Sequence, residues 1–175
     1  MIESLYYKGL YQAAAGAFEK AAAAADELKE AMDKSPAEEN PRQYYSLLGR
    51  IEHLKGNYAK AADFFEKIET ELETNINHSL IGIDDFAAEA FYMAGRLEEA
   101  RERYDGMLAL TVGRLFGGHL HTKSHYMLGK ICERQGDKTK AIENYKKFLD
   151  LWKDADPGFA EVDDAKTRIA ELKKQ

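Results

Sequence analysis

Hydrophobic and polar residues follow a helical spacing in the segments between the glycine and proline breaks. The segment nearest the C-terminus shows this most clearly, because its hydrophobic residues recur at steps of three and four and form one stripe. Charged residues occupy the positions between them. The stripe consists of Phe159, Val162, Ala165, Ile169 and Leu172. The pattern predicts an all-α protein made of successive amphipathic helices.

The breaks give the expected helix boundaries. Residues 1–8 are expected to be the truncated end of a first helix. The alanine-rich segment 11–34 is expected to be one long helix that ends at Ser35-Pro36. Paired helices follow, and Asp156-Pro157-Gly158 separates them from a last helix. The later predicted helices cover residues 42–55, 58–74, 81–94, 97–111, 120–135, 138–152 and 159–174.

One short motif occurs four times, with a glycine, an alanine five residues later and an aromatic residue nine residues later. Glycine can end a helix because it adopts a left-handed backbone without steric penalty. The alanine marks a close crossing of two helices, and the aromatic side chain fills the gap one turn further on. The copies are Gly9…Ala14…Phe18, Gly56…Ala61…Phe65, Gly95…Ala100…Tyr104 and Gly136…Ala141…Tyr145. Small residues at Gly49, Ala88 and Gly129 indicate further close helix contacts.

These motifs resemble the tetratricopeptide repeat, a helix–turn–helix unit that stacks into a right-handed superhelix. The resemblance implies a single array over 1–175. Its units lie near 1–34 (truncated), 42–75, 81–114 and 120–155, and a capping helix covers 159–174. The chain also resembles the C-terminal repeat region of bacterial multi-repeat proteins. We therefore expect a piece of a longer bacterial protein, located in the cytoplasm.

Composition narrows the function classes. A net charge of −6 argues against sequence-independent binding to nucleic acid or to anionic membranes, which requires a basic surface. The single cysteine, Cys132, excludes an internal disulfide, and its position one turn after Leu128 predicts a buried structural thiol. No catalytic constellation or cofactor fingerprint is present, so we expect neither an enzyme nor a bound cofactor.

Two histidines form the only candidate metal site. His121 and His125 are four residues apart and would share one helix face. Neither an HExxH motif nor a neighbouring cysteine completes a ligand set. We therefore favour a polar helix surface, with a partly buried structural role for His125, over a metal site.

The resemblance also implies a binding face, because the first helix of each tetratricopeptide unit lines a concave groove. We expect that groove to hold a peptide or a partner helix from another protein. The corresponding residues combine a basic patch, an acidic centre and several tyrosines, and tyrosine and arginine are common at interface hot spots. These residues are Gln43, Ser46, Arg50, His53, Asp85, Glu89, Tyr92, Lys123, Tyr126, Lys130 and Arg134.

Two alternatives remain open. One is self-association into a homodimer through the uncapped N-terminal end, where Leu5, Leu10 and Ala14 would be poorly covered. The other is service as the C-terminal regulatory region of a larger signalling or enzyme polypeptide.

Overall fold

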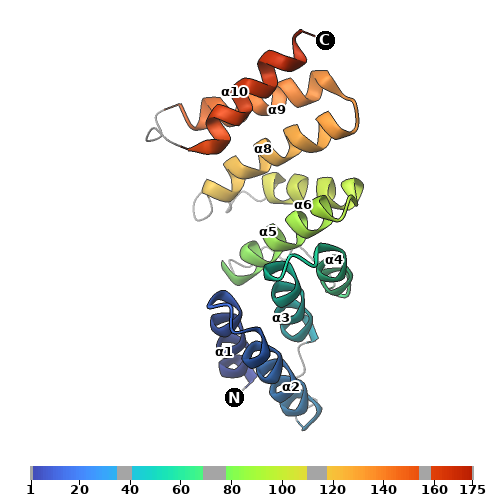
Figure 1. Ribbon diagram of the computed structural model, residues 1–175, viewed down its shortest axis with the longest axis vertical. Helices are drawn as coiled ribbons and strands as arrows, with labels where there is room; N and C mark the ends of the chain where they lie inside the picture. Colours follow the sequence, from blue (N-terminus) through green and yellow to red (C-terminus); the bar gives the residue numbers. More distant parts are fainter. Residues whose placement is uncertain (1, 35–40, 69–77, 110–117, 154–158, 175) are drawn as a thin grey trace. The chain divides into compact units, whose positions relative to one another are not determined.

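The computed structural model describes residues 2–34, 41–68, 78–109, 118–153 and 159–174, without the side chains of 78–84. These residues form only helices and the turns between them, which confirms the predicted all-α fold (Figure 1). The chain divides into two compact units, and the division falls within α5. Unit 1 comprises Met1–Glu73 with Glu89–Arg96, and unit 2 comprises Thr74–Ala88 with Leu97–Gln175. The helices are α1 Ile2–Ala14, α2 Phe18–Lys34, α3 Pro41–Leu54, α4 Tyr58–Glu66, α5 His78–Met93, α6 Leu97–Ala109, α8 Gly118–Arg134, α9 Lys138–Leu151 and α10 Ala160–Leu172.

Tight glycine turns join the two helices of each pair. Gly16, Gly56, Gly95 and Gly136 have φ values of 74°, 80°, 81° and 80°, a left-handed conformation that strains any residue with a Cβ. In the first turn, the amide of Ala17 donates to the carbonyl oxygen of Gln12 at 2.9 Å. A hydrogen bond from an amide to the carbonyl oxygen five residues earlier is typical of a Schellman motif at a helix end. The same bond recurs in the other three turns.

The predicted register of the N-terminal segment is wrong. Residues 2–34 form the complete pair α1 and α2, in place of a truncated helix over 1–8 and a long helix over 11–34. The turn lies at Gly16, and Gly9 is buried in the middle of α1.

The error has a physical origin. Gly9 lies seven residues before its turn glycine, as Gly49 and Gly129 do in their pairs. Seven residues are close to two helical turns, so a shift of that length returns to the same helix face and imitates the motif. The position nine residues after Gly16 holds Ala25 instead of an aromatic residue, which conceals the true register.

Unit 1 has one continuous hydrophobic core between α1, α2 and α3. Leu28 and Leu47 are fully buried in it, together with Ala21 and Ala25 of α2, and Tyr6 is almost fully buried. Leu5 and Leu10 are partly buried against this core, so they do not form the exposed apolar end that was predicted. Glu52 is also buried, in the position where an aromatic residue is usual in this repeat.

The buried carboxylate of Glu52 is held by its neighbours. Asn57 Nδ2 donates to its Oε2 at 2.9 Å, and Lys55 and Lys60 lie 3.2 and 3.4 Å from its Oε1. Burial favours protonation, but the hydrogen bonds from Asn57 and Lys55 and the charges of Lys55 and Lys60 outweigh it. The pKa of Glu52 therefore lies below its ordinary value of 4.5.

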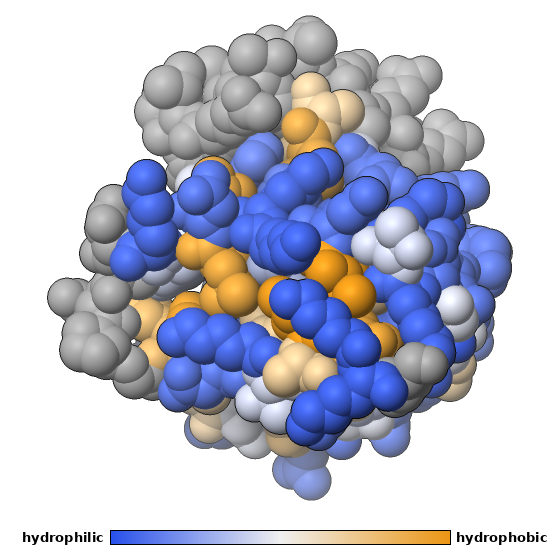
Figure 2. Space-filling model, turned by 90° about the horizontal axis from the view of Figure 1, so that it is seen from above, coloured by the Kyte–Doolittle hydropathy of each residue, from blue (hydrophilic) through white to orange (hydrophobic). Residues whose placement is uncertain are grey.

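Unit 2 packs α6, α8, α9 and α10 around buried aromatic residues (Figure 1). Tyr104 and Tyr145 are fully buried, and Cys132 is buried as predicted. The last helix covers this core with Ala165 and Leu172, and its exposed positions carry Asp163, Lys166, Glu171 and Lys173. Seen from the end where α10 lies, the surface is mainly hydrophilic, as expected of a capping helix (Figure 2).

The other helices begin and end close to the predicted residues. The largest difference is in α4, which ends at Glu66 against a predicted end at 74. Of that predicted segment, residues 69–74 lie outside the described residues. The grouping of the helices into four units with the predicted bounds remains a prediction.

Candidate partner-binding site

The predicted binding residues of unit 1 lie on α3 and on the last turns of α5. His53 Nε2 approaches Glu89 Oε2 at 4.0 Å, so these two first helices bring predicted residues together. Gln43 and Arg50 are partly exposed, whereas Tyr92 is buried except for a small fraction of its surface. The His53 ring also lies edge-on to Tyr58, with the ring centroids 5.3 Å apart.

Ser46 does not belong to an accessible face. Its side chain is fully buried, and its Oγ shares a hydrogen bond of 3.1 Å with the hydroxyl group of Tyr6 on α1. A buried hydroxyl that is already paired offers no contact to a ligand. We therefore remove Ser46 from the candidate site.

Two predicted residues of unit 2 form an ion pair between α5 and α8. Lys123 Nζ lies 3.3 Å from Asp85 Oδ1. About two fifths of the Lys123 side chain is exposed, and Asp85 is more buried. The predicted basic patch and acidic centre therefore neutralise one another at this point.

Beside this ion pair is a pocket of about 150 Å³. Four aromatic side chains give it a largely apolar lining, and a cavity of about this size accepts a benzene ring. Neighbouring ring centroids are 5.2 Å apart for Tyr126 and Phe148, 6.4 Å for Phe148 and Trp152, and 4.6 Å for Trp152 and Phe159. The lining residues are His119, Lys123, Tyr126, Phe148, Trp152, Phe159 and Glu161.

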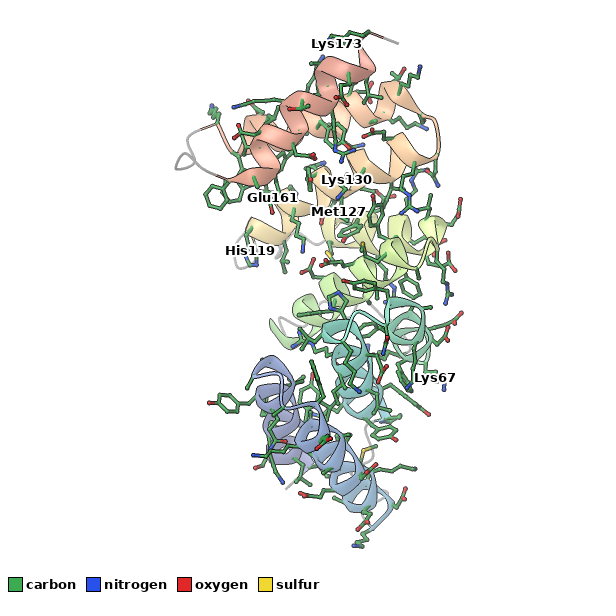
Figure 3. All side chains as sticks on the ribbon, in the orientation of Figure 1. Lys67, His119, Met127, Lys130, Glu161 and Lys173 are labelled. Carbon is green, nitrogen blue, oxygen red and sulfur yellow. The ribbon has the colours of Figure 1, made fainter. Side chains whose placement is uncertain are left out.

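The polar residues of the pocket come from two helix starts. His119 and Glu161 lie at the same end of unit 2, where α8 and α10 begin (Figure 3). The indole Nε1 of Trp152 is buried and has no hydrogen-bond partner among the described residues. A buried N–H without a partner costs free energy, and a carbonyl or carboxylate oxygen would relieve it.

A partly buried polar network holds Tyr126, one of the aromatic residues of the pocket. The Tyr126 hydroxyl donates to Asp164 Oδ2 at 2.7 Å, and Arg168 Nε donates to the same oxygen at 2.6 Å. Glu133 Oε2 in turn accepts from Arg168 Nη1 at 3.1 Å and from the Tyr145 hydroxyl at 2.8 Å. Burial and the adjacent carboxylates raise the pKa of both tyrosines, so both hydroxyls remain protonated donors. The network therefore joins α8, α9 and α10 and fixes the Tyr126 ring.

The remaining predicted residues of unit 2 lie beside the pocket or away from it. Lys130 Nζ is 5.3 Å from the centroid of the Tyr126 ring, a cation–π distance, and Arg134 is exposed. The rings of His121 and His125 are 5.4 Å apart, and His125 Nδ1 is 3.3 Å from Asn144 Oδ1. Among the residues that the structure describes, no three side chains of the metal-binding types gather at one point.

Sequence reasoning missed most of the pocket. It restricted the search to the first helices, but Phe148 belongs to the second helix α9 and Trp152 is the C-cap of that helix. Phe159 is the N-cap of α10, and Glu161 lies in its first turn. One signal was present, because Phe148 and Trp152 are four residues apart and Trp152 is the only tryptophan of the chain.

The described helices, paired through glycine turns and stacked side by side in each unit, define a helical-repeat protein. Sequence profiles of the tetratricopeptide repeat match residues 3–75 and 83–154, which together cover most of the chain. The chain belongs to the tetratricopeptide repeat family. Proteins of this family are generally scaffolds for protein–protein interaction, and this chain is of that general class.

Solved structures share the fold. The chain is similar to BtubC (BKLC) from P. vanneervenii with a TM-score of 0.72 and 21% identity, over 99% of this chain and 72% of that one. It is also similar to a MamA protein with a TM-score of 0.66 and 18% identity, over 99% and 86% of the two chains. A second MamA structure is similar with a TM-score of 0.60 and 18% identity, over 95% of this chain and 92% of that one. No curated protein matches the sequence significantly. No helix among the described segments is both long and apolar enough to cross a membrane.

Proposed function

We propose that the chain binds a peptide segment of a partner protein in the pocket of unit 2. The observation that carries this proposal is the cluster of four aromatic side chains that lines a pocket of about 150 Å³. The pocket lies beside the Lys123–Asp85 ion pair on the first helices. Such a pocket suits one large apolar side chain of a partner.

The other predicted residues extend this site. Lys130 and Arg134 continue along α8 from the pocket, and Gln43, Arg50, His53 and Glu89 provide a separate polar face in unit 1. We propose them as secondary contacts, because they lack a comparable apolar anchor. We propose no catalytic step for this chain.

Trp152 makes the proposal directly testable, since it is the only tryptophan and it lines the pocket. Peptides would be selected from a displayed random library on the immobilised chain and then titrated while the tryptophan emission is recorded. We expect enriched peptides to shift that emission with micromolar affinity.

Phe159→Ala is the informative variant, because Phe159 is 43% exposed and its removal should disturb the core little. We expect a loss of affinity of about tenfold or more. Leu151→Ala is the matched control, because Leu151 is 52% exposed on α9 and does not line the pocket. Equal weakening by both variants, or binding that leaves the emission unchanged, would place the partner elsewhere.

A further inference from the structure

One face of α1 is exposed and uncharged. Tyr7 is 50% exposed, and Tyr11, which is nearer the turn, is 79% exposed. Ser4 and Ala14 are also exposed. These four residues follow one another at steps of three and four, so they form a single stripe along the helix. We call this stripe the α1 face.

Most of the corresponding positions of later first helices are buried. Tyr7 and Tyr11 stand nine and five residues before the turn glycine Gly16. Of the six residues at those distances from the other turn glycines, Phe86 is partly buried and the other five are at most 5% exposed. The five are Leu47, Ile51, Ala90, Met127 and Ile131.

The reason for that burial is visible in unit 1. Leu47 of α3 packs onto α1, where a Cβ added to Gly9 would lie 2.5 Å from its Cδ2. The face that carries Leu47 is therefore the face by which a first helix stacks on another helix pair. The α1 face is the same surface of its own helix, and within the described residues nothing covers it.

The chemistry of the α1 face differs from that of its buried counterparts. Where they carry leucine, isoleucine, methionine, alanine or phenylalanine, none of which has a hydroxyl group, α1 carries two tyrosines. A tyrosine ring buries apolar area against a partner while its hydroxyl group tolerates water, which suits an interface that opens and closes. Such a face is suited to an exchangeable partner.

The order of the residues indicates what that partner is. The stripe reads small, tyrosine, tyrosine, small, and it is symmetric about residue 9. If two α1 helices cross antiparallel at that residue, Tyr7 of each lies opposite Tyr11 of the other, and Ser4 lies opposite Ala14. A two-fold interface requires this kind of self-complementary pattern. We propose that the α1 face pairs with the α1 face of a second copy of this chain.

The charges nearby are compatible with this pairing. Lys8 is already engaged with Glu27 of α2 at 2.8 Å, so it does not need a partner across the interface. In the antiparallel register neither Glu3 nor Lys8 meets a like charge, because they lie opposite Ala15 and Leu10. Stacking of the α1 face on α10 of another copy is less suitable, since the exposed face of α10 carries charged side chains that would lose their water.

The size of the face sets the expected strength. Stable protein interfaces bury at least about 1,200 Å² in total, and one helix stripe from each copy buries less. We therefore expect a dissociation constant on the order of 100 μM. This inference does not depend on peptide binding by unit 2, which uses other residues.

The first test is the mass of the complete chain in sedimentation equilibrium between about 10 μM and 1 mM. We expect the apparent mass to rise from 19.8 kDa towards twice that value. The double variant Tyr7→Glu with Tyr11→Glu should remain a monomer, and Leu151→Glu, which alters an equally exposed apolar residue of α9, should still associate. A wild-type monomer throughout, or association of the double variant, would overturn the proposal.

A second test addresses the register. Tyr7→Cys and Tyr11→Cys proteins with different tags are oxidised separately and as a mixture, and the native Cys132 is buried. We expect the mixed 7–11 disulfide to form faster than either 7–7 or 11–11. Predominance of the like pairs would indicate a parallel arrangement, and the absence of cross-links beyond the wild-type background would contradict contact at this face.

Discussion

In the α8–α9 pair, the ring of Tyr145 lies directly over Gly129, where an added Cβ would be 2.6 Å from two ring carbons. In the α1–α2 pair, the position that corresponds to Tyr145 holds Ala25, and the side chain over Gly9 is Leu47 of the next helix pair. The α8–α9 pair therefore fills the gap from its own second helix, whereas in the α1–α2 pair the gap is filled from α3. A short side chain at one repeat position is compensated by a longer one in the neighbouring repeat.

The polar interactions differ in the same way. In unit 2, Tyr145 is part of a network that includes Glu133 and Arg168 and extends to α10. In unit 1, the hydrogen bond between Tyr6 and Ser46 is the corresponding link between two first helices. The α1–α2 pair thus depends on apolar contact with α3, and the α8–α9 pair depends on its own ring and hydroxyl.

The largest effect should come from removal of the ring that fills unit 2. Tyr145→Ala would leave a cavity in a fully buried site and should lower the free energy of unfolding by about 3–5 kcal/mol. The measurement is urea unfolding followed by the emission of Trp152, which lies in unit 2. Tyr145→Phe keeps the ring and loses only the hydrogen bond to Glu133, so its loss should be about 1–2 kcal/mol. Similar losses for both variants would mean that the hydroxyl, and not the ring, stabilises the pair.

A smaller effect should distinguish the two glycines. In Gly129→Ala the new methyl group meets the body of a buried ring, and overpacking of this kind costs about 1–3 kcal/mol. In Gly9→Ala it meets the methyl end of Leu47, which can move, and the gain in helix propensity of up to about 1 kcal/mol should offset the contact. Urea unfolding followed by circular dichroism measures both. If Gly9→Ala were as destabilising as Gly129→Ala, Leu47 would be as rigidly held as Tyr145.

Much of this fold could be predicted from the sequence, because glycine turns and helical periodicity are local signals. Three of the four turn glycines were identified from a motif that spans only ten residues. The first turn was missed because its helix pair lacks the aromatic residue and because Gly9 imitates a turn glycine two helical turns away. Leu47, which takes the place of that aromatic side chain, lies far along the chain, and local spacing carries no information about it.

The candidate site was less predictable. The resemblance to the family indicated Lys123 and Tyr126, both of which line the pocket. It also indicated Ser46, whose burial results from a hydrogen bond to a residue of another helix pair. Trp152 and Phe159 belong to the ends of two different helices, and the contact between their rings is a product of tertiary packing.

The smallest expected effect concerns acid stability, because each unit contains a partly or largely buried carboxylate that its neighbours keep ionised. Burial favours protonation of Asp164, but the hydrogen bonds from Arg168 and Tyr126 outweigh it and lower its pKa from the ordinary 3.8. A lowered pKa stabilises the folded chain above the unfolded value, and that contribution is lost as the pH falls through the folded value. Since Asp164 is more than one third exposed, screening limits the contribution to below about 1 kcal/mol.

Asp164→Asn should therefore be slightly less stable than the wild type at pH 7, and the two should converge below about pH 4, when urea unfolding is followed through Trp152. Glu52→Gln provides the comparison in unit 1, because the pKa of Glu52 is also lowered, from 4.5. The Glu52→Gln variant should change the stability in acid that urea unfolding followed by circular dichroism measures. It should leave the transition followed by tryptophan emission unchanged. A constant difference between Asp164→Asn and the wild type at every pH would show that Asp164 acts through packing and not through its charge.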